Sequence, residues 1–224
     1  MSKIIVLEGT DCSGKETQTK LLEASLKEKG IKCIRLSFPV YNSPTGRVVG
    51  QAYLGKPEMG PSFFKEGPVK VDPYISSLYY AADRKYNIDK LKEYIDNDYV
   101  IILDRYTTSN MAHQGSKIED KDERFNMYQW IDKLEFWLLK LPKPDITIFL
   151  HLPVKYSYKL KENRKFCDGL ETDEEYQKKT EKAYIELSEL YNWKKIECIK
   201  DDAIRNKEDI HEEIMNIIMK YKKN

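Results

Sequence analysis

The sequence is poor in cysteine and has no long hydrophobic run. Only four of its 224 residues are cysteine, and these lie far apart with no Cys-x-x-Cys pair. Neither a disulfide framework nor a zinc site of closely spaced cysteines is therefore expected. No apolar stretch approaches the roughly 18 residues of a membrane-spanning helix. An apolar run already begins at residue 3, which leaves no room for a signal peptide, so we expect a cytoplasmic protein without a membrane partner.

The sequence also lacks an excess of charge of either sign. Its 38 lysines and arginines balance 37 aspartates and glutamates, and the formal net charge is +1. This balance argues against a surface that coats nucleic acid, but it allows a local basic pocket for a phosphorylated small molecule. Hydrophobic residues make up 41% of the chain, and no repeat or low-complexity segment interrupts it. We therefore expect a single domain over residues 1–224.

The most informative pattern present lies at residues 3–17. An apolar, β-branched run at 3–8 is typical of a buried strand, and residues 14–29 have the pattern of a helix. Two glycines five residues apart lie between them, followed by a lysine, which is the arrangement of a phosphate-binding loop. Glycines let backbone N–H groups turn towards phosphate oxygens, the helix N-terminus adds its dipole, and the lysine reaches the terminal phosphates. An ordinary strand–turn–helix is the alternative interpretation.

The loop supplies the predicted residues for the phosphoryl donor. These are Gly9, Ser13, Gly14, Lys15, Glu16 and Thr17. Lys15 is also predicted to be catalytic, because it is the cation nearest the transferred group. Glu16 departs from the usual pattern, in which a serine or threonine offers its hydroxyl to Mg²⁺ at this position.

Apolar runs and helical stretches alternate along the rest of the chain. Strands are expected at 3–8, 31–37, 99–104, 145–150 and 193–199. Helices are expected at 14–29, about 45–54, 72–97, 123–140, 153–163, 172–191 and 206–221. This order predicts an α/β fold, with a five-stranded parallel sheet flanked by helices and a site at the carboxyl ends of its strands.

Three of these helices carry more detailed expectations. Asp72 and Thr172 are the expected N-caps of 72–97 and 172–191, the second with Glu175 as its reciprocal partner. One apolar face of 72–97 is expected from Ile75, Leu78, Tyr79 and Ala82, which recur at helical spacing. In 123–140, the aromatic residues Trp130, Phe136 and Trp137 are expected in the core.

Asp104 is the predicted metal ligand. The run 99–104 is continuous and apolar, which makes it the expected central strand, and it ends in this carboxylate. A carboxylate at the end of a strand beside a phosphate loop is placed to serve Mg²⁺. A cap for the following helix is the alternative role.

Residues 159–171 are expected to form a short lid. They concentrate Lys159, Lys161, Arg164 and Lys165 just before a glycine. Such a run is usually a solvated charged face. In a phosphoryl-transfer enzyme it would instead close cations over the transferred group and exclude water.

The phosphate loop allows several classes of protein. A base-reading Asn-Lys-x-Asp motif, typical of GTPases, is absent, and ATPase motors usually need a longer chain. The chain instead resembles the thymidylate kinases over nearly its whole length. The resemblance rests on residues 8–15 (EGTDCSGK), Phe38-Pro39, the Ala-Ala-Asp-Arg sequence ending at Arg84, Asp104-Arg-Tyr106, and the segment from Glu171 to Tyr184. It implies a homodimer that uses ATP and Mg²⁺ to phosphorylate dTMP.

The resemblance also implies roles for individual residues. The acceptor-binding residues would be Asp11, Phe38, Tyr80, Arg84, Arg105, Asn110 and His113. Tyr80 matches the aromatic residue that stacks on thymine, and Arg84 would reach an exocyclic oxygen of the base. Arg105 would bridge the acceptor and donor phosphates, and Arg164 would act from the lid. Without the resemblance, Tyr80 and His113 would be interpreted as structural residues, and Asp11 as a turn residue.

Val40 departs from the family pattern and leaves alternatives open. Many relatives have an arginine just after Phe38-Pro39 to bind the acceptor phosphate, and Arg47 is a possible substitute here. The loop also lacks the arginine that some relatives have at the Cys12 position. A kinase for another nucleoside monophosphate or for a deoxynucleoside is the first alternative. A nucleotide-binding paralogue without turnover is the second.

Overall fold

The computed structural model describes residues 3–161, 170 and 173–221 and contains a five-stranded parallel sheet. Its strands are β1 (Lys3–Glu8), β2 (Cys33–Ser37), β3 (Val100–Asp104), β4 (Ile146–His151) and β5 (Lys194–Glu197). Their spatial order is β2-β3-β1-β4-β5, and every neighbouring pair is parallel. The predicted fold class is confirmed. The central strand is β1 rather than 99–104, because β1 has two strands on each side, β3 and β2 on one and β4 and β5 on the other.

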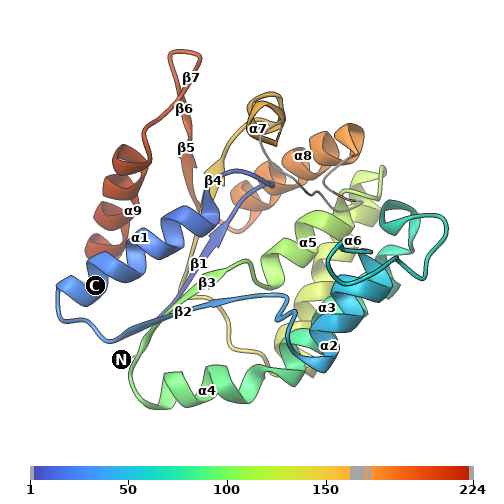
Figure 1. The fold of residues 1–224 in the computed structure, drawn as a ribbon, viewed down its shortest axis with the longest axis horizontal. Helices are drawn as coiled ribbons and strands as arrows, with labels where there is room; N and C mark the ends of the chain where they lie inside the picture. The colour runs from blue at the N-terminus through green and yellow to red at the C-terminus, as the bar shows by residue number, and fades with distance from the viewer. Residues whose placement is uncertain (1–2, 162–169, 171–172, 222–224) are drawn as a thin grey trace.

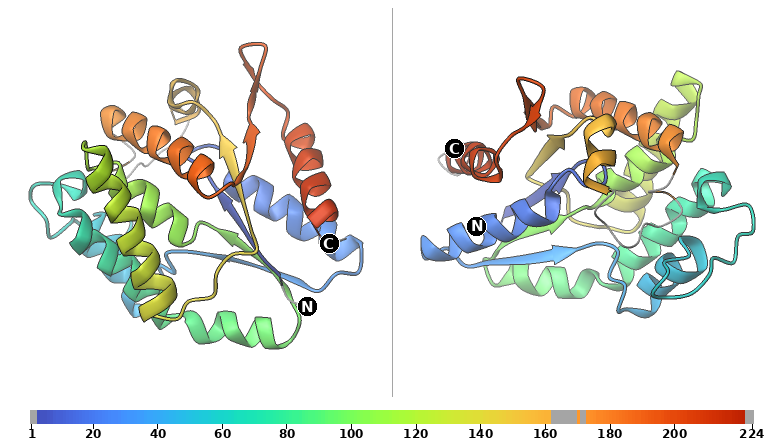
Figure 2. Two further views of the ribbon diagram at one scale, coloured as in Figure 1. Left: turned by 180° about the vertical axis from the view of Figure 1, so that it is seen from behind. Right: turned by 45° about the horizontal axis from the view of Figure 1, so that its top comes forward.

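Helices cover both faces of the sheet (Figures 1 and 2). They are α1 (Lys15–Glu28), α2 (Pro44–Arg47), α3 (Pro73–Tyr86), α4 (Ile88–Asp96), α5 (Thr107–Gly115), α6 (Lys121–Asp132), α7 (Val154–Lys161), α8 (Glu174–Leu190) and α9 (Lys207–Tyr221). Two π-helical turns, η1 (Val48–Tyr53) and η3 (Lys133–Leu138), extend α2 and α6, and a 3₁₀ turn, η2 (Pro68–Lys70), precedes α3.

Alternate residues of β1 enter different apolar clusters. Ile5 and Leu7 pack with α1 and α9, whereas Ile4 and Val6 pack with α4. A third cluster joins α5, α6 and α8 to β4 through Phe149. Because successive side chains of a strand point to opposite faces, the continuous apolar run of β1 is what a strand covered on both faces requires.

The helix expected at 72–97 is two helices. The cap on Asp72 is confirmed, since its Oδ1 accepts hydrogen bonds from the N–H groups of Tyr74 and Ile75. The chain breaks at Asn87 into α3 and α4. The apolar face expected on this segment is wrong as a core face, because Ile75 and Leu78 are 44% and 50% exposed. The face of α3 that is buried carries small and polar side chains, namely Ser76, Ser77, Ala81, Asp83 and Arg84.

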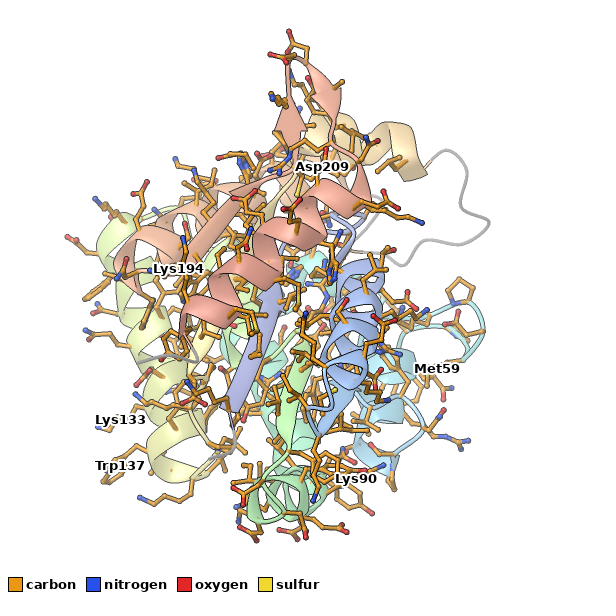
Figure 3. The ribbon with its side chains drawn as sticks, turned by 90° about the vertical axis from the view of Figure 1, so that its left-hand side faces the viewer. Met59, Lys90, Lys133, Trp137, Lys194 and Asp209 are labelled. Atoms are coloured by element: carbon orange, nitrogen blue, oxygen red, sulfur yellow. The ribbon has the colours of Figure 1, made fainter. Side chains whose placement is uncertain are left out.

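Other boundaries also differ from expectation. Asp173, rather than Thr172, caps α8 by accepting from the Tyr176 N–H at 2.9 Å. Trp137 is 60% exposed, and in Figure 3 it projects away from the protein body together with Lys133. Most of the lid expected at 159–171 lies outside the described residues.

A small hairpin was missed by the sequence pattern. It joins β6 (Ile199–Lys200) to β7 (Ala203–Ile204), directly after β5, and projects at the top of Figure 1. The two residues between these strands, Asp201 and Asp202, have positive φ angles of 50° and 58°. This is the backbone of a two-residue hairpin turn, which aspartate tolerates better than most residues.

Candidate active site

The phosphate loop joins β1 to α1, and its backbone requires glycine at two positions. Gly14 caps α1 with a positive φ of 86°, a conformation that residues with a Cβ rarely adopt. A Cβ on Gly9 would lie 2.5 Å from Ser13 Oγ and 2.6 Å from the carbonyl oxygen of Leu150. At Gly9 the loop therefore packs against itself and against β4 more closely than any side chain would allow.

Lys15 begins α1 and places a buried cation against the loop. Its Nζ donates to the Thr10 carbonyl oxygen at 2.7 Å and lies 3.5 Å from Ser13 Oγ. Burial, together with the positive charge of Arg105, lowers the pKa of Lys15 to about 8. The ammonium group is therefore poorly compensated, and it gains most from the arrival of an anion such as a phosphate.

Asp11 and Arg105 form an ion pair that joins the phosphate loop to the end of β3. One oxygen of Asp11 contacts Nη2 of Arg105, and the other accepts from Gln177 Nε2 at 3.0 Å. Nη1 of Arg105 donates to the Tyr184 hydroxyl at 3.2 Å. Arg105 has a positive φ of 66°, and such strained positions cluster at functional sites. The guanidinium group is thus held between the loop and α8.

Glu8 ends β1 and is fully buried at the base of this site. Its Oε1 accepts from the Thr108 hydroxyl at 2.5 Å and from the Tyr106 N–H at 3.1 Å. Its Oε2 accepts from Ser109 Oγ at 2.5 Å and from the Tyr184 hydroxyl at 3.1 Å. A buried carboxylate needs such partners, and the positive end of α5 adds to its stabilisation. These bonds lock β1, α5 and α8 together around Arg105.

A cavity of about 490 Å³ opens at the carboxyl ends of the strands. Most of the predicted site residues line it: Asp11, Gly14, Lys15, Glu16, Thr17, Phe38, Tyr80, Arg84, Asp104, Arg105, Asn110 and His113. Gly9 and Ser13 do not line the cavity and instead support the loop backbone. Arg164 lies outside the described residues. The structure therefore brings residues from five separate parts of the chain to one cavity.

The part of the cavity away from the phosphate loop combines an aromatic wall with buried polar groups. Tyr80 packs edge-on against Tyr53, with ring centroids 5.8 Å apart. Arg84 and Asn110 lie on α3 and α5, and both donate hydrogen bonds to the buried carboxylate of Glu135 on η3. An apolar face with a few fixed polar groups is the usual design of a site for a planar ring.

Asp104 ends β3 beside Lys15 and also lines the cavity. Among the described residues, no group of three histidine, cysteine, aspartate or glutamate side chains is placed to hold a metal ion. Mg²⁺ commonly binds through one or two carboxylates together with phosphates and waters, so a single carboxylate fits an ion that arrives with a nucleotide. Glu16 fits this role less well, because its side chain is 65% exposed and bonds Lys20 at 2.6 Å.

Comparison with known proteins decides the family. The family model described as thymidylate kinase matches residues 7–214. The chain belongs to the thymidylate kinase family. It is 31% identical to a probable thymidylate kinase of Thermococcus kodakarensis, covering 96% of each chain. It is also 31% identical to the thymidylate kinase of Brachyspira hyodysenteriae, covering 98% of this chain and 95% of the other.

A solved structure shares the fold. The thymidylate kinase of Candida albicans superposes with a TM-score of 0.72 at 24% identity, covering 99% of this chain and 92% of the other. Within the described part of the chain, no helix is both long and apolar enough to span a bilayer.

Val40 remains the main departure from the thymidylate kinase pattern. Its side chain offers no charge, and its N–H donates to Asp83 at 2.8 Å, which holds the segment after β2 against α3. Arg47, the possible substitute, is exposed and does not line the cavity. Lys56 does line it, with its Nζ 5.0 Å from the centre of the Tyr41 ring.

His113 lies on α5 beside Arg105 and lines the cavity. Its Nε2 lies 3.4 Å from Nη1 of Arg105, which is a donor, and its Nδ1 lies 2.9 Å from the Tyr176 hydroxyl. This arrangement assigns the ring proton to Nδ1 in a neutral imidazole. Burial, together with the charge of Arg105, lowers the pKa of His113 to about 3. His113 is therefore a neutral wall of the cavity.

Several residues of this site were missed from the sequence. Lys56 sits in an irregular loop that has no pattern to place it. Gln177 and Tyr184 lie seven residues apart on one face of α8, and this spacing was an available signal for polar groups directed at one place. Glu8 and Glu135 were missed because a charged residue is normally exposed.

Proposed function

We propose that this protein transfers the terminal phosphate of ATP to dTMP, giving ADP and dTDP. One observation carries the proposal: a single cavity joins the phosphate loop to a pocket fit for a base. Lys15 and Arg105 lie at the loop, and Tyr80, Arg84 and Asn110 lie at the other part of the same cavity. The membership of the thymidylate kinase family supports the same acceptor. Buried free thiols at Cys33 and Cys198 suit a reducing compartment, and we propose the cytoplasm.

The chemistry needs alignment more than proton transfer. An oxygen of the dTMP phosphate attacks the γ-phosphorus of ATP, and the bond from that phosphorus to the bridging β-oxygen breaks to release ADP. The acceptor phosphate is already a nucleophile near neutral pH, so no general base is required. The protein must hold two polyanions together, and Lys15 and Arg105 supply positive charge for this. The pairing of Asp11 with Arg105 orients that guanidinium before substrate binds.

Mg²⁺ would be held chiefly by the nucleotide phosphates, with Asp104 as the protein carboxylate. When bound, it neutralises charge that develops on the transferred phosphoryl group. Asp104 lies close enough to Lys15 to raise the pKa of that lysine against the larger effect of burial. A carboxylate and an ammonium group that both line the cavity suit a bound metal–phosphate unit.

We also propose that Lys56 supplies the acceptor-side cation that Val40 lacks. The cationic side chains that line the cavity in the described part of the chain are Lys15, Lys56, Arg84 and Arg105. Arg84 is committed to Glu135, and Lys15 belongs to the phosphate loop. Lys56 lines the same cavity beside Tyr41, and we assign it, together with Arg105, to the acceptor phosphate.

The protein is further proposed to be a homodimer, joined through the exposed apolar residues of α3. This face, called here the α3 face, comprises Tyr74, Ile75, Leu78 and Tyr86, which are 42%, 44%, 50% and 59% exposed. Tyr74 also packs edge-on against Trp130 of α6 with ring centroids 4.8 Å apart, so the apolar surface continues onto the next helix. A second copy is the expected occupant, because apolar patches on monomers are rarely contiguous over a helix.

A panel of acceptors tests the proposed function. ADP release would be measured by a coupled assay with ATP and Mg²⁺, offering dTMP, dUMP, dGMP, dCMP and thymidine in turn. We expect the largest kcat/KM for dTMP. A better rate with another monophosphate would show that the acceptor is misassigned. Tight binding of dTMP without any ADP release would instead identify a nucleotide-binding protein without turnover.

A further inference from the structure

Glu135 is a charged residue in the middle of the protein. It lies on η3 and is 0% exposed, at the place where α3, α5 and the end of α6 meet. Its Oε2 accepts from Arg84 Nε at 2.5 Å. Its Oε1 accepts from Arg84 Nη2 at 2.5 Å and from Asn110 Nδ2 at 2.9 Å. One carboxylate therefore holds two residues that line the cavity.

The bond to Glu135 determines which way the amide of Asn110 faces. A carboxylate only accepts hydrogen bonds, so the NH₂ group of Asn110 must be the part that faces Glu135. The same nitrogen donates to the Ser77 carbonyl oxygen at 3.3 Å, which is again only an acceptor. The remaining group, Oδ1, has no hydrogen-bond partner in the described part of the chain. A buried carbonyl without a partner is unusual, and it calls for a donor.

The same carboxylate determines what Arg84 offers. Two of its nitrogens, Nε and Nη2, are bound to Glu135 in a bidentate pair. The third, Nη1, makes no hydrogen bond to the residues that the structure describes, and Arg84 lines the cavity. Among the described residues, Arg84 therefore has a donor without a partner and Asn110 has a buried acceptor without a partner, and both residues line the cavity.

We propose that Glu135 is a positioning residue that makes the cavity select keto over amino bases. It fixes the position of Arg84, which can only donate, and it turns the amide of Asn110 so that the oxygen is left to accept. This pair matches a base edge with a ring N–H beside a carbonyl oxygen. Thymine and uracil carry this edge, and cytosine carries the inverse, a ring acceptor beside an amino donor. Guanine has the same N–H and carbonyl edge. These hydrogen bonds therefore distinguish keto from amino bases, and the size of the cavity must distinguish pyrimidines from purines. This inference rests on the proposed function, in which the base lies against Arg84 and Asn110.

Glu135→Gln removes one acceptor oxygen from this position and keeps the size of the side chain. A glutamine offers one oxygen and one NH₂ group, so it cannot accept from Arg84 through both atoms. Arg84 bonds both oxygens of Glu135, so one of its nitrogens faces the new NH₂ group in either orientation of the amide. If the NH₂ group takes the place of Oε1, Asn110 faces it as well and must turn, which directs its own NH₂ group to the base. A site rejects a ligand strongly when binding it would leave a buried polar group of the site without a hydrogen bond. If that group can turn to bond the wrong ligand as well, the preference between the two ligands is lost.

The test compares dTMP with dCMP in wild type and in Glu135→Gln. We expect KM for dTMP to rise about tenfold or more and the dTMP-to-dCMP ratio of kcat/KM to fall at least tenfold. The KM for ATP and kcat with saturating dTMP should change less than about threefold, because the phosphate loop is untouched. Calorimetric binding of dTMP and dCMP, without ATP, provides a second readout that does not depend on turnover.

Two further variants separate positioning from stability. Glu186→Gln removes a carboxylate from another ion pair, with Arg124 at 2.9 Å, which joins α8 to α6 and does not line the cavity. It should leave the base preference unchanged whatever it does to the unfolding midpoint. Glu135→Asp keeps both acceptor oxygens on a shorter arm, so it should recover part of the preference lost in Glu135→Gln. It also carries the test if the glutamine variant does not fold.

An unchanged dTMP-to-dCMP ratio in Glu135→Gln, with only a lower unfolding midpoint, would overturn the proposal. So would a wild-type ratio in Glu135→Asp if only that variant folds. Failure of the proposed function looks different. In that case the wild-type protein itself shows no preference for dTMP in the acceptor panel, before any variant is measured.

Discussion

Lys15 donates its hydrogen bond to the carbonyl oxygen of Thr10, 2.7 Å away in the same loop. Without a ligand, the ammonium group bonds the backbone of the phosphate loop, and a bound phosphate would be a stronger acceptor than this neutral carbonyl. Replacing it by methionine keeps the length of the side chain and removes the charge. For Lys15→Met we expect kcat to fall by at least about 10²–10³, the usual loss when one preorganised group at the transferred charge is removed.

The fold of Lys15→Met should survive this change. Burial removes water from the charged Lys15 side chain, which destabilises the folded protein and lowers the pKa of this lysine. The unfolding midpoint at pH 7 should therefore equal or exceed that of the wild type. Thermal unfolding followed by circular dichroism checks this. Full activity in the variant would rule out the assignment of the phosphate loop.

The pH dependence of ATP use should show the same lysine. Its pKa in the free protein is about 8, so the charged form that attracts phosphate is lost as pH rises through this value. We expect kcat/KM for ATP to fall above about pH 8, with a slope of one proton. The limb in kcat should lie at higher pH, because bound phosphates raise the pKa. Lys15→Arg should abolish the limb in whatever activity remains, since arginine does not titrate there.

Stability should follow the opposite trend over the same titration. The unfolded lysine has its ordinary pKa of 10.5, and the folded one has a pKa of about 8. Between these values the unfolded state binds more protons, so this group makes the free energy of unfolding rise with pH. The difference in unfolding free energy between wild type and Lys15→Met, measured at pH 7.5 and 9.5, isolates this contribution. A difference that does not change with pH would contradict the buried, charged state of Lys15.

Tyr80→Ala should weaken dTMP much more than ATP. Loss of ring stacking on a base is worth about 1–3 kcal/mol, or roughly 5- to 150-fold in affinity. Tyr79→Ala is the matched control, because Tyr79 also packs against Tyr53, at 6.2 Å, but does not line the cavity. Calorimetric titration with each nucleotide measures the effect. An equal loss for both ligands, or an equal loss in both variants, would assign Tyr80 to the packing of this aromatic cluster alone.

Lys56→Met should raise KM for dTMP by roughly tenfold, the effect of losing one charge-assisted hydrogen bond. The KM for ATP should stay within about twofold. Arg47→Met is the control, since Arg47 is exposed and lies outside the cavity lining. Steady-state kinetics at saturating ATP gives the comparison. If Arg47→Met raised KM for dTMP more than Lys56→Met, the cation that compensates for Val40 would be Arg47 of α2 instead of Lys56.

Leu78→Glu should separate the proposed homodimer into monomers. A charge in the centre of the α3 face would be buried without a partner on association, which costs several kcal/mol. Leu190→Glu is the control, because Leu190 is 48% exposed on α8 and lies outside the α3 face. Sedimentation velocity at several protein concentrations reports the mass. A monomeric wild type, or a dimeric Leu78→Glu, would exclude this face as the interface.

The phosphate loop could be predicted because its pattern is local. A buried strand, two glycines and a lysine constrain one another within about fifteen residues, and the structure places the loop between β1 and α1 as expected. The same holds for the cap on Asp72, since capping depends only on the next three residues. The middle of the sheet was equally predictable, because β1, β3 and β4 are continuous apolar runs, as strands covered on both faces require.

What escaped prediction depends on contacts between distant segments. The spacing of Ile75 and Leu78 correctly indicates a helix, but it cannot say whether their face meets this chain or solvent. From the sequence alone Glu135 would be expected on the surface, because a charged residue is normally exposed. Its partners Arg84 and Asn110 come from α3 and α5, which no local pattern predicts. The position of β1 at the centre of the sheet likewise follows from pairing, which no local pattern encodes.

That central position bears on how the protein is made. Of the five strands of the sheet, β1 is synthesised first, yet its two partners are β3 and β4, which begin at Val100 and Ile146. Until β3 and β4 have been synthesised, both edges of this apolar strand are unpaired. Such an edge can pair with strands of other chains and cause aggregation. The phosphate loop takes its final form only after Leu150 packs against Gly9. A chain truncated before β4 should therefore aggregate rather than bind nucleotide.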